Sequence, residues 1–240
     1  MSAHPWQSCR VTAIIQETPN TRRFMMEVPG SSSFDFEPGQ FVTLDLPIHE
    51  APAKRRRSYS IASWPDGSNR FELVIVLLAD GLGTEYLFNE VKEGSELVFR
   101  GAMGKFRLPP VLDKDLFLIC TGTGIAPFRS MAHHIRNKNI PHKNVHLLFG
   151  TRKKEDLLYY DELKQLETEL PGFFYRPALS REAWEGAQHG YVHSLYEECC
   201  TQKQPAYFYL CGWKNMVNEA KERIVAMGYD RKSIHQELYG

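Results

Sequence analysis

The stretch LFLICTGTGIAP, residues 116–127, determines how the rest of the chain is interpreted. Leu116–Cys120 form an apolar run of strand length, as expected of a strand that is covered on both faces. Gly122 and Gly124 then allow a sharp turn without a Cβ in the way of a ligand. Pro127 suits the first turn of a helix, whose free N–H groups would point at an anion over the turn. The stretch predicts a phosphate-binding turn, although glycines also occur in turns that bind nothing.

Strands and helices are expected to alternate through the second half of the chain. Strands are expected at 116–120, 145–149, 173–178, 207–210 and 234–238, and helices at 127–138, 160–169, 193–200 and 214–227. This alternation predicts a doubly wound parallel sheet with right-handed crossovers. Ligands bind such sheets beyond the carboxyl ends of the strands, where TGTGIAP, Ser180-Arg181 and Cys211-Gly212 fall.

The first half of the chain has a different pattern. Short strands separated by Pro, Gly, Asp and Ser clusters are expected at 9–15, 23–28, 41–46, 57–62, 71–78 and 96–101. Six such strands predict an antiparallel barrel or sandwich. One helix is expected near Thr84, with Thr84 as its N-cap. Because Pro109-Pro110 interrupts the pattern, we expect two domains, at 1–109 and 110–240.

Composition limits the classes of function. The 240 residues are enough for two domains, and the 29 Lys and Arg balance the 29 Asp and Glu. No overall positive charge therefore favours nucleic acid or an anionic membrane. The chain shows neither a signal-peptide pattern nor an apolar run of membrane-spanning length, so a cytoplasmic protein is expected.

Cysteine and histidine spacing predicts no metal site. The five cysteines include no C-x-x-C and no cluster spaced for zinc or an iron–sulfur centre. His133 and His134 are neighbours, whereas metal-binding pairs on a helix are four residues apart. They are expected to be solvated or packed.

Six motifs, in order, resemble the ferredoxin–NADP reductase family across nearly the whole chain. They are Arg57-Ser58-Tyr59-Ser60, Gly83-Thr84, GTGIAPFRS at 122–130, Ser180-Arg181-Glu182, Cys211-Gly212 and Glu237-Leu238-Tyr239. The resemblance implies an N-terminal six-stranded antiparallel Greek-key barrel that binds FAD and a C-terminal α/β domain that binds a nicotinamide nucleotide.

In the barrel, the resemblance implies a flavin site. Arg57 can offer a fork of donors to phosphate, Tyr59 lies against the isoalloxazine, and Ser60 reaches its N5 edge. Gly83 and Thr84 receive the pyrophosphate at a helix N-terminus. Without the family pattern, Arg57 would be a solvated member of a basic run and Thr84 only a helix cap. FMN is a less favoured alternative to FAD.

In the second domain, the resemblance implies a nucleotide site. The pyrophosphate side of the dinucleotide is held by the turn that contains Thr121, Gly122, Thr123, Gly124 and Pro127. Ser180 and Arg181 take the adenosine 2′-phosphate, and Arg152 supplements them. An arginine here favours NADP(H). Because His189 stands where a lysine of the strictest NADP pattern is expected before Tyr191, NAD(H) stays open.

Four residues are expected to act in catalysis by the same resemblance. Cys211, followed by Gly212, lies beside the nicotinamide C4, where a small polarizable side chain lets the two rings approach. Glu237 moves a proton to or from N5 in the vicinity of Ser60. Tyr239 covers the flavin and moves aside for the nicotinamide. Gly240 departs from members that end on the aromatic residue itself.

The function expected is hydride exchange with NADP(H) and single-electron exchange with a separate acceptor such as ferredoxin or flavodoxin. A basic rim of Lys54, Arg55, Arg56, Lys105 and Arg107 would attract such acidic carriers. We expect a monomer. One alternative is an NADH-dependent reductase component of an oxygenase or another redox system. Another is a flavoprotein subunit that relays electrons or senses nucleotides.

Overall fold

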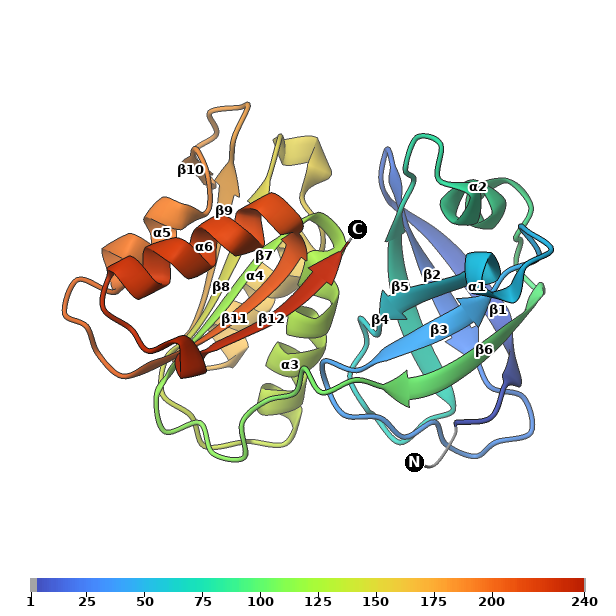
Figure 1. Ribbon diagram of the computed structural model, residues 1–240. Coiled ribbons are helices and arrows are strands. Elements are labelled where there is room, and N and C mark those ends of the chain that lie inside the picture. The colour runs from blue at the N-terminus through green and yellow to red at the C-terminus, as the bar shows by residue number, and fades with distance from the viewer. Residues whose placement is uncertain (1–3, 240) are drawn as a thin grey trace. The chain divides into compact units, whose positions relative to one another are not determined.

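The structure, a computed structural model, describes residues 4–239 (Figure 1). The chain forms two compact units. The first runs to Arg107 and also takes in Arg129–His134. The second comprises Leu108–Phe128 and the chain from Ile135 onward. Helix α3 (Ala126–Asn137) therefore contributes residues to both units.

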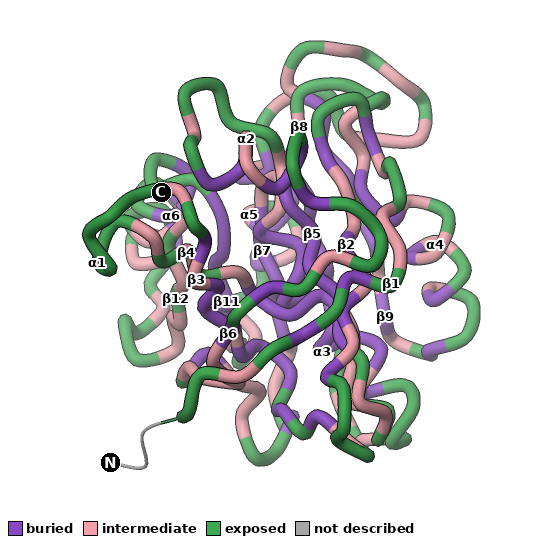
Figure 2. Tube along the Cα trace, turned by 90° about the vertical axis from the view of Figure 1, so that its right-hand side faces the viewer, coloured by how far each residue is buried: buried purple, intermediate pink, exposed green. Residues whose placement is uncertain are grey.

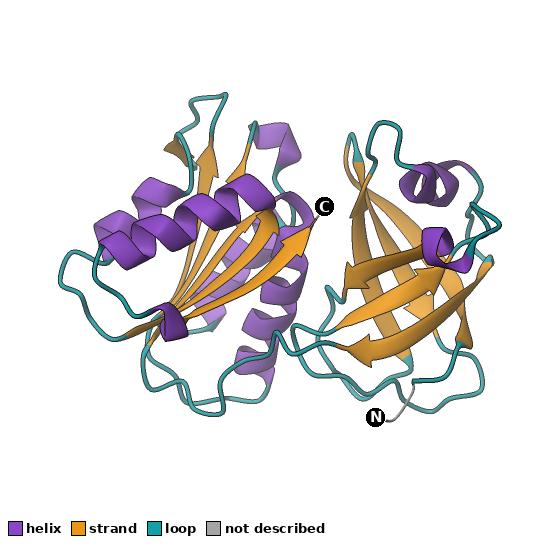
Figure 3. Cartoon of the chain, in the orientation of Figure 1, coloured by secondary structure: helices purple, strands orange, loops and turns teal. Residues whose placement is uncertain are grey.

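The first unit is built on an antiparallel sheet of six strands in the order β4-β3-β6-β1-β2-β5 (Figure 3). The strands are β1 (Gln7–Thr18), β2 (Thr21–Glu27), β3 (Phe41–Asp45), β4 (Arg56–Ser60), β5 (Arg70–Val76) and β6 (Glu96–Met103). Just beyond β4, Ile61 forms an antiparallel bridge with Leu73 of β5. The Ala62 N–H also donates to the Glu72 carbonyl at 2.8 Å. These contacts join the two end strands, so the predicted six-stranded barrel is confirmed.

The barrel core follows from the period-two alternation of its strands. In β1, Cys9 and Val11 are fully buried and Arg10 and Thr12 are exposed, as expected when alternate side chains point inward. Val42 and Leu44 of β3 are also fully buried. The rings of Phe34, Phe71 and Phe99 form a cluster with centroids 4.8–5.6 Å apart. Aromatic clusters of this kind bury large apolar areas. The core therefore fixes β3, and with it the neighbouring strand β4.

Helix α2 (Leu82–Asn89) starts earlier than expected. Its N-cap is Gly81, so the prediction that Thr84 is the N-cap is wrong. The chain turns through a left-handed residue, Asp80 (φ 60°), just before the helix. Thr84 instead lies in the first turn, where its hydroxyl donates to the Gly81 carbonyl at 3.0 Å and accepts from the Leu78 N–H at 3.1 Å. The hydroxyl thus ties the helix to the loop that precedes it.

The second unit contains a parallel sheet in the order β10-β9-β8-β7-β11-β12. The strands are β7 (Asp115–Thr121), β8 (Val145–Thr151), β9 (Phe173–Leu179), β10 (Gln188–His189), β11 (Ala206–Trp213) and β12 (Ile234–Tyr239). Helices α3 and α4 (Tyr160–Glu169) cover one face, and α5 (His193–Cys199) and α6 (Lys214–Ala226) cover the other (Figure 1). The direction of strand order reverses between β7 and β11. The predicted doubly wound fold is confirmed, and this reversal is where such folds bind ligands.

Strand β7 is buried on both faces. Leu116, Phe117, Leu118, Ile119 and Cys120 all have 0% of their surface exposed, and the central strands of this sheet are purple in Figure 2. An apolar run without alternation is the pattern expected of a strand between two helix layers. The prediction for 116–120 is confirmed.

Two short elements were not predicted. Helix α1 (Pro52–Arg55) has four residues, and strand β10 has two. Neither is long enough for a hydrophobic period to show in the sequence. Three 3₁₀ turns also lie outside the prediction: η1 (Gly122–Ile125), η2 (Lys154–Asp156) and η3 (Arg231–Ser233).

Candidate functional site

Strand β4 carries the first set of candidate residues. Arg57 and Tyr59 stand directly opposite Leu44 and Val42 of β3. Opposite residues of an antiparallel pair share a face, so both side chains emerge on the core side of the barrel. The Tyr59 ring packs against the core. Burial raises the pKa of the Tyr59 phenol, and the nearby Arg57 charge offsets only part of this rise. Tyr59 therefore presents a neutral ring.

The Arg57 side chain passes the first turn of α2. A Cβ on Gly83 would lie 2.9 Å from Arg57 Cγ and 3.0 Å from Nε. The glycine therefore leaves the space that the arginine fills. The Arg57 Nη1 donates to the carbonyls of Lys54 at 2.9 Å and Arg56 at 2.8 Å. These bonds hold the guanidinium beside the α2 N-terminus, and both groups can donate to an anion.

Ser60 and Thr84 lie deeper in the first unit, with 4% and 8% of their surface exposed. Ser60 ends β4 opposite Phe41 of β3, so it points to the other face of the strand from Tyr59. The Thr84 hydroxyl bonds to the loop backbone, as described above. A direct contact of Thr84 with phosphate stays a prediction, whereas its role in shaping the turn follows from these bonds.

The glycine turn follows β7 as η1, and α3 begins at once with Ala126 and Pro127. Gly122 is left-handed, with φ of 53°, a conformation that glycine adopts without strain. The Thr121 hydroxyl accepts a hydrogen bond from the Trp213 N–H at 3.2 Å. The turn thus has the geometry expected from its sequence. Trp213, 57% exposed, was not predicted as a neighbour of the turn.

Two glycines allow the turn and the end of β11 to touch. A Cβ on Gly124 would collide with the Cys211 carbonyl group, 2.7 Å from its carbon. A Cβ on Gly212 would collide with Thr121, 2.8 Å from its carbonyl oxygen. Gly212 also has a φ of 133°, which side chains rarely tolerate. The structure therefore brings Thr121, Gly124, Cys211 and Gly212 together through backbone contact.

The carboxyl ends of β11 and β12 bring three of the predicted catalytic residues together. Cys211 is paired with Glu237, and Trp213 with Tyr239, in the parallel ladder. Glu237 and Tyr239 are two residues apart, so they share a face of the strand. Cys211 is fully buried. Burial, and then the Glu237 charge, raise the pKa of its thiol well above the usual value, and a hydrogen bond with the Tyr239 side chain lowers it by less. The thiol is therefore neutral.

The loops after β8 and β9 join through backbone hydrogen bonds. The Ser180 N–H and hydroxyl both donate to the Thr151 carbonyl, at 3.0 and 3.2 Å. The Arg181 N–H donates to the Arg152 carbonyl at 2.9 Å. The structure thus brings Ser180, Arg181 and Arg152 to one edge of the sheet, as predicted from their places at strand ends.

An open cavity of about 570 Å³ lies at this edge. It is lined by Lys153, Lys154, Glu155, Arg181 and Glu182. The Lys154 N–H donates to Glu182 Oε2 at 2.7 Å, so this carboxylate holds the loop after β8. The two lysines were not predicted as site residues. In the sequence, two lysines followed by two acidic residues indicate only a solvated surface. The folded loop is what places the lysines in the same lining as Arg181.

Two absences concern the part of the chain that the structure describes. Within residues 4–239, no group of three or more His, Cys, Asp or Glu side chains is placed to hold a metal ion. Over the same residues, every helix is too short or too polar to cross a membrane.

Two family models match the chain, one in its first half and one in its second half. The model described as oxidoreductase FAD-binding domain matches residues 8–108. The model described as oxidoreductase NAD-binding domain matches residues 118–222. The first range contains Arg57, Tyr59, Gly83 and Thr84, and the second contains the glycine turn.

Individual relatives agree with these matches. The chain is 35% identical to ferredoxin–NADP reductase B of Sorangium cellulosum over 100% of its own length and 99% of the relative's. It is 32% identical to the glycine betaine monooxygenase reductase subunit of Pseudomonas aeruginosa over 96% of its length, but spans only 63% of that relative. Among solved structures, it resembles a ferredoxin NADP+ reductase from Neisseria gonorrhoeae with bound FAD and NADP. The TM-score is 0.80 at 26% identity, covering 97% of this chain and 98% of that one.

Proposed function

Because the chain belongs to the ferredoxin–NADP reductase family of FAD- and NAD-binding oxidoreductases, we propose that it exchanges hydride with NADP(H) and passes single electrons to a separate protein carrier. We propose further that residues 1–109 bind FAD and residues 110–240 bind the nucleotide. The proposal is supported by two contacts, one in each unit: the Arg57 side chain lies against Gly83, and the glycine turn lies against Gly212.

The first unit fits FAD. The cofactor needs an aromatic face at its ring and donors at its pyrophosphate. Tyr59 offers a neutral ring on the core side of β4, and Arg57 offers its guanidinium beside the first turn of α2. We propose that these residues, with Gly83 and Thr84, hold the flavin and its pyrophosphate, and that Ser60 faces N5. Bound FAD would supply the exchange between two-electron and one-electron transfer.

The chain's own residues would prepare the nucleotide for reaction. We propose that Thr121, Gly122, Thr123, Gly124 and Pro127 form the turn that receives its pyrophosphate. The N–H groups of Gly122, Thr123 and Gly124 lie in the 3₁₀ turn that leads into α3 and can donate to an anion, whereas Pro127 has no N–H and lies in the first turn of the helix. Cys211 is small and neutral, so it permits close approach of the nicotinamide. Glu237, its neighbour in the ladder, would move a proton at N5, and Tyr239 would cover the flavin until the nucleotide enters.

A preference for NADP(H) is supported by the charges around the cavity. Its cationic side chains, Lys153, Lys154 and Arg181, suit a dianionic 2′-phosphate. Glu182 Oε2 accepts from the Lys154 N–H, and Lys153 pairs with Glu155 at 3.2 Å. The three cations outnumber these two carboxylates of the lining. Ser180 and Arg152 complete the proposed phosphate site. NAD(H) is the second candidate, because the 32% identical Pseudomonas relative is named as a reductase subunit of a monooxygenase.

We propose an acidic carrier, such as a ferredoxin or flavodoxin, as the acceptor. Two members of the expected basic rim form ion pairs: Arg55 with Asp45 at 2.8 Å and Arg107 with Glu37 at 2.6 Å. Lys54, Arg56 and Lys105 then carry the electrostatic attraction that we expect. A monomer in the cytoplasm is part of the same proposal. Size-exclusion chromatography and cell fractionation test these two points.

The absorption spectrum of the purified protein tests the proposed function. We expect an oxidised-flavin spectrum that NADPH bleaches under anaerobic conditions, with NADH less effective at equal concentration. Equal or faster bleaching by NADH would favour the oxygenase-type reductase. A relay or sensing subunit would bind flavin and nucleotide but reduce neither an artificial acceptor nor a ferredoxin at a steady rate. A chain that takes up no flavin on reconstitution would reject all three.

A further inference from the structure

Two side chains of α3 contact the segment that leaves the proposed flavin strand at Ser60. Arg129 and His133 are four residues apart, so they lie one turn apart on the same helix face. The Arg129 Nη1 donates to the Ala62 carbonyl at 2.9 Å, and its guanidinium lies 5.3 Å from the centre of the Trp64 ring. The His133 ring stacks on the same indole, with centroids 4.1 Å apart. All of these residues belong to the first compact unit.

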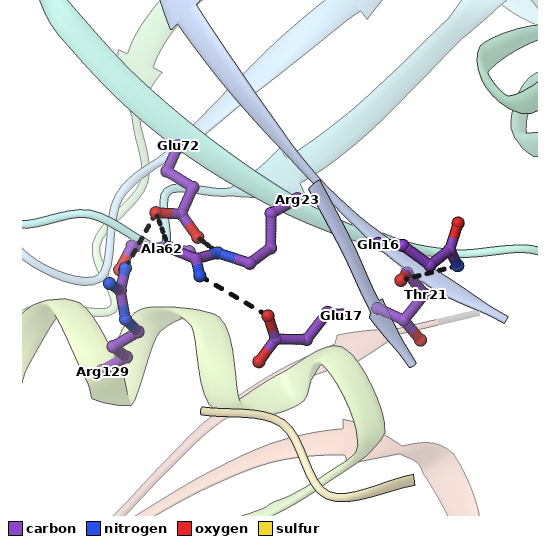
Figure 4. A network of polar contacts seen from close by, with 7 residues as sticks. All are labelled: Gln16, Glu17, Thr21, Arg23, Ala62, Glu72 and Arg129. Atoms are coloured by element: carbon purple, nitrogen blue, oxygen red, sulfur yellow. Dashed lines mark hydrogen bonds and ion pairs between the residues drawn. The ribbon is translucent and has the colours of Figure 1, made fainter. Parts of the chain in front are cut away.

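Arg129 also joins a buried ionic network (Figure 4). Its Nη1 lies 3.2 Å from Oε2 of Glu72, on β5. Arg23 of β2 binds the same carboxylate through two bonds, of 2.7 Å from Nε to Oε1 and 3.1 Å from Nη2 to Oε2. Arg23 is also paired with Glu17 at 3.5 Å. Arg129 and Arg23 thus share the Glu72 carboxylate, and Glu17 extends the network through Arg23.

Stability alone does not account for such a pair. Arg129 and Glu72 are 4% and 2% exposed, and the desolvation of a buried ion pair can cost as much as the pair gains. Its position is more informative. The Glu72 carbonyl accepts from the Ala62 N–H at 2.8 Å, and its own N–H donates to the Ser63 hydroxyl at 3.0 Å. The Glu72 backbone thus holds Ala62 and Ser63, and Arg129, which is bound to the Glu72 carboxylate, also holds Ala62.

We infer that Arg129 is a positioning residue of the flavin site, which fixes the end of β4 so that Ser60 keeps its orientation. The inference rests on the proposed function, in which Ser60 faces N5. One residue, Ile61, separates Ser60 from the carbonyl that Arg129 binds. The Ile61 N–H donates to the Gln40 carbonyl at 3.0 Å. Displacement of Ala62 would therefore be transmitted to Ser60 through two peptide units.

The test compares Arg129→Met with Arg23→Met in the full chain loaded with FAD. Each substitution removes one cation from Glu72, but only the first also removes the bond to Ala62. For Arg129→Met we expect flavin reduction by saturating NADPH to slow about tenfold, as small misplacements of reacting groups do, with a shifted flavin absorption band and an unchanged Kd for NADPH. For Arg23→Met we expect a lower Tm but the wild-type rate and spectrum.

Arg129→Lys keeps the charge but loses the fork of donors, so we expect a rate between those of wild type and Arg129→Met. A wild-type rate and spectrum in Arg129→Met, or an equal slowing in Arg23→Met, would overturn the inference. Should Arg129→Met fail to fold, Arg129→Lys decides: a slower rate supports the positioning role, and a wild-type rate rejects it. Failure of the proposed function is separate, because wild-type flavin would then resist reduction by either nucleotide.

Discussion

The two proposed cofactor sites would hold an anion by opposite means. In the first unit, the donor is a side chain: Arg57 fills the space that Gly83 leaves beside α2. In the second, two backbones touch because Gly124 and Gly212 have no Cβ. A site made by a side chain fails when that side chain is removed, and one made by backbone contact fails when a side chain is added. The following substitutions test this contrast.

The largest effect is expected from Gly212→Ala. The new Cβ would collide with Thr121, and a φ of 133° is strained for alanine. We expect NADPH to bind about 100-fold more weakly, because collision adds to a conformational cost of roughly 1–3 kcal/mol. Titration of the nucleotide difference spectrum measures this. Gly190→Ala is the control, since its φ is 118° but nothing lies within 4 Å of a Cβ there. Equal losses in both variants would mean that strain, not contact, explains the effect.

The second effect concerns the side-chain site. Arg57→Gln removes the positive charge and leaves a shorter, neutral polar side chain. We expect FAD to bind the apoprotein about 30-fold more weakly, because hydrogen bonds to charged groups contribute about 1.5–3 kcal/mol. Fluorescence titration of FAD measures the Kd. The control is Arg56→Gln on the same strand, where the side chain faces away from Arg57. Unchanged FAD affinity in Arg57→Gln would remove this residue from the proposed site.

A smaller and selective effect is expected at the cavity. Arg181→Gln should raise the KM for NADPH about tenfold and leave the KM for NADH unchanged, because a charge-assisted contact to the 2′-phosphate would be lost. Steady-state kinetics with both nucleotides measure the ratio. Arg176→Gln, on β9 of the same sheet, is the control. A loss shared by NADPH and NADH would show that Arg181 shapes the loop and does not select the phosphate.

The smallest effect is expected from Thr84→Val. It removes the hydrogen bonds to Leu78 and Gly81 but keeps the side-chain shape. We expect the free energy of unfolding to fall by about 1 kcal/mol, because a typical intramolecular hydrogen bond contributes about 0.5–1.5 kcal/mol. Thermal or urea unfolding of the apoprotein measures this. Thr84→Ser keeps the hydroxyl and should be close to wild type. A Thr84→Val variant as stable as wild type would show that these hydrogen bonds contribute nothing to stability.

The sequence predicted those features that depend on local pattern. The apolar run at Leu116–Cys120 and the glycines after it determine a buried strand and a turn by themselves, so fold class and turn were both correct. Thr84 was placed wrongly as an N-cap because Gly81 and Gly83 offered competing starts. The chain turns at the left-handed residue Asp80, and the dipeptide Asp80-Gly81 is the turn signal that marks the observed start.

Contacts between distant residues could not be predicted. Arg129 and Glu72 are separated by 57 positions, and an arginine on a polar helix reads as solvated. Lys153 and Lys154 are candidate site residues only because the fold places the loop after β8 beside Arg181. Trp213 was missed for the same reason, since its neighbour Thr121 is 92 residues away. Propensity and spacing carry no information on such pairs.

The place of β11 beside β7 has a consequence for biosynthesis. Tyr59 and Gly83 belong to a barrel whose last strand ends at Met103, so its six strands leave the ribosome early. The glycine turn is translated soon afterwards, but its neighbours Cys211 and Gly212 follow about 90 residues later. Domains generally fold in order of synthesis. We therefore expect a nascent chain to fold the barrel, with its proposed flavin site, well before it can bind a nucleotide.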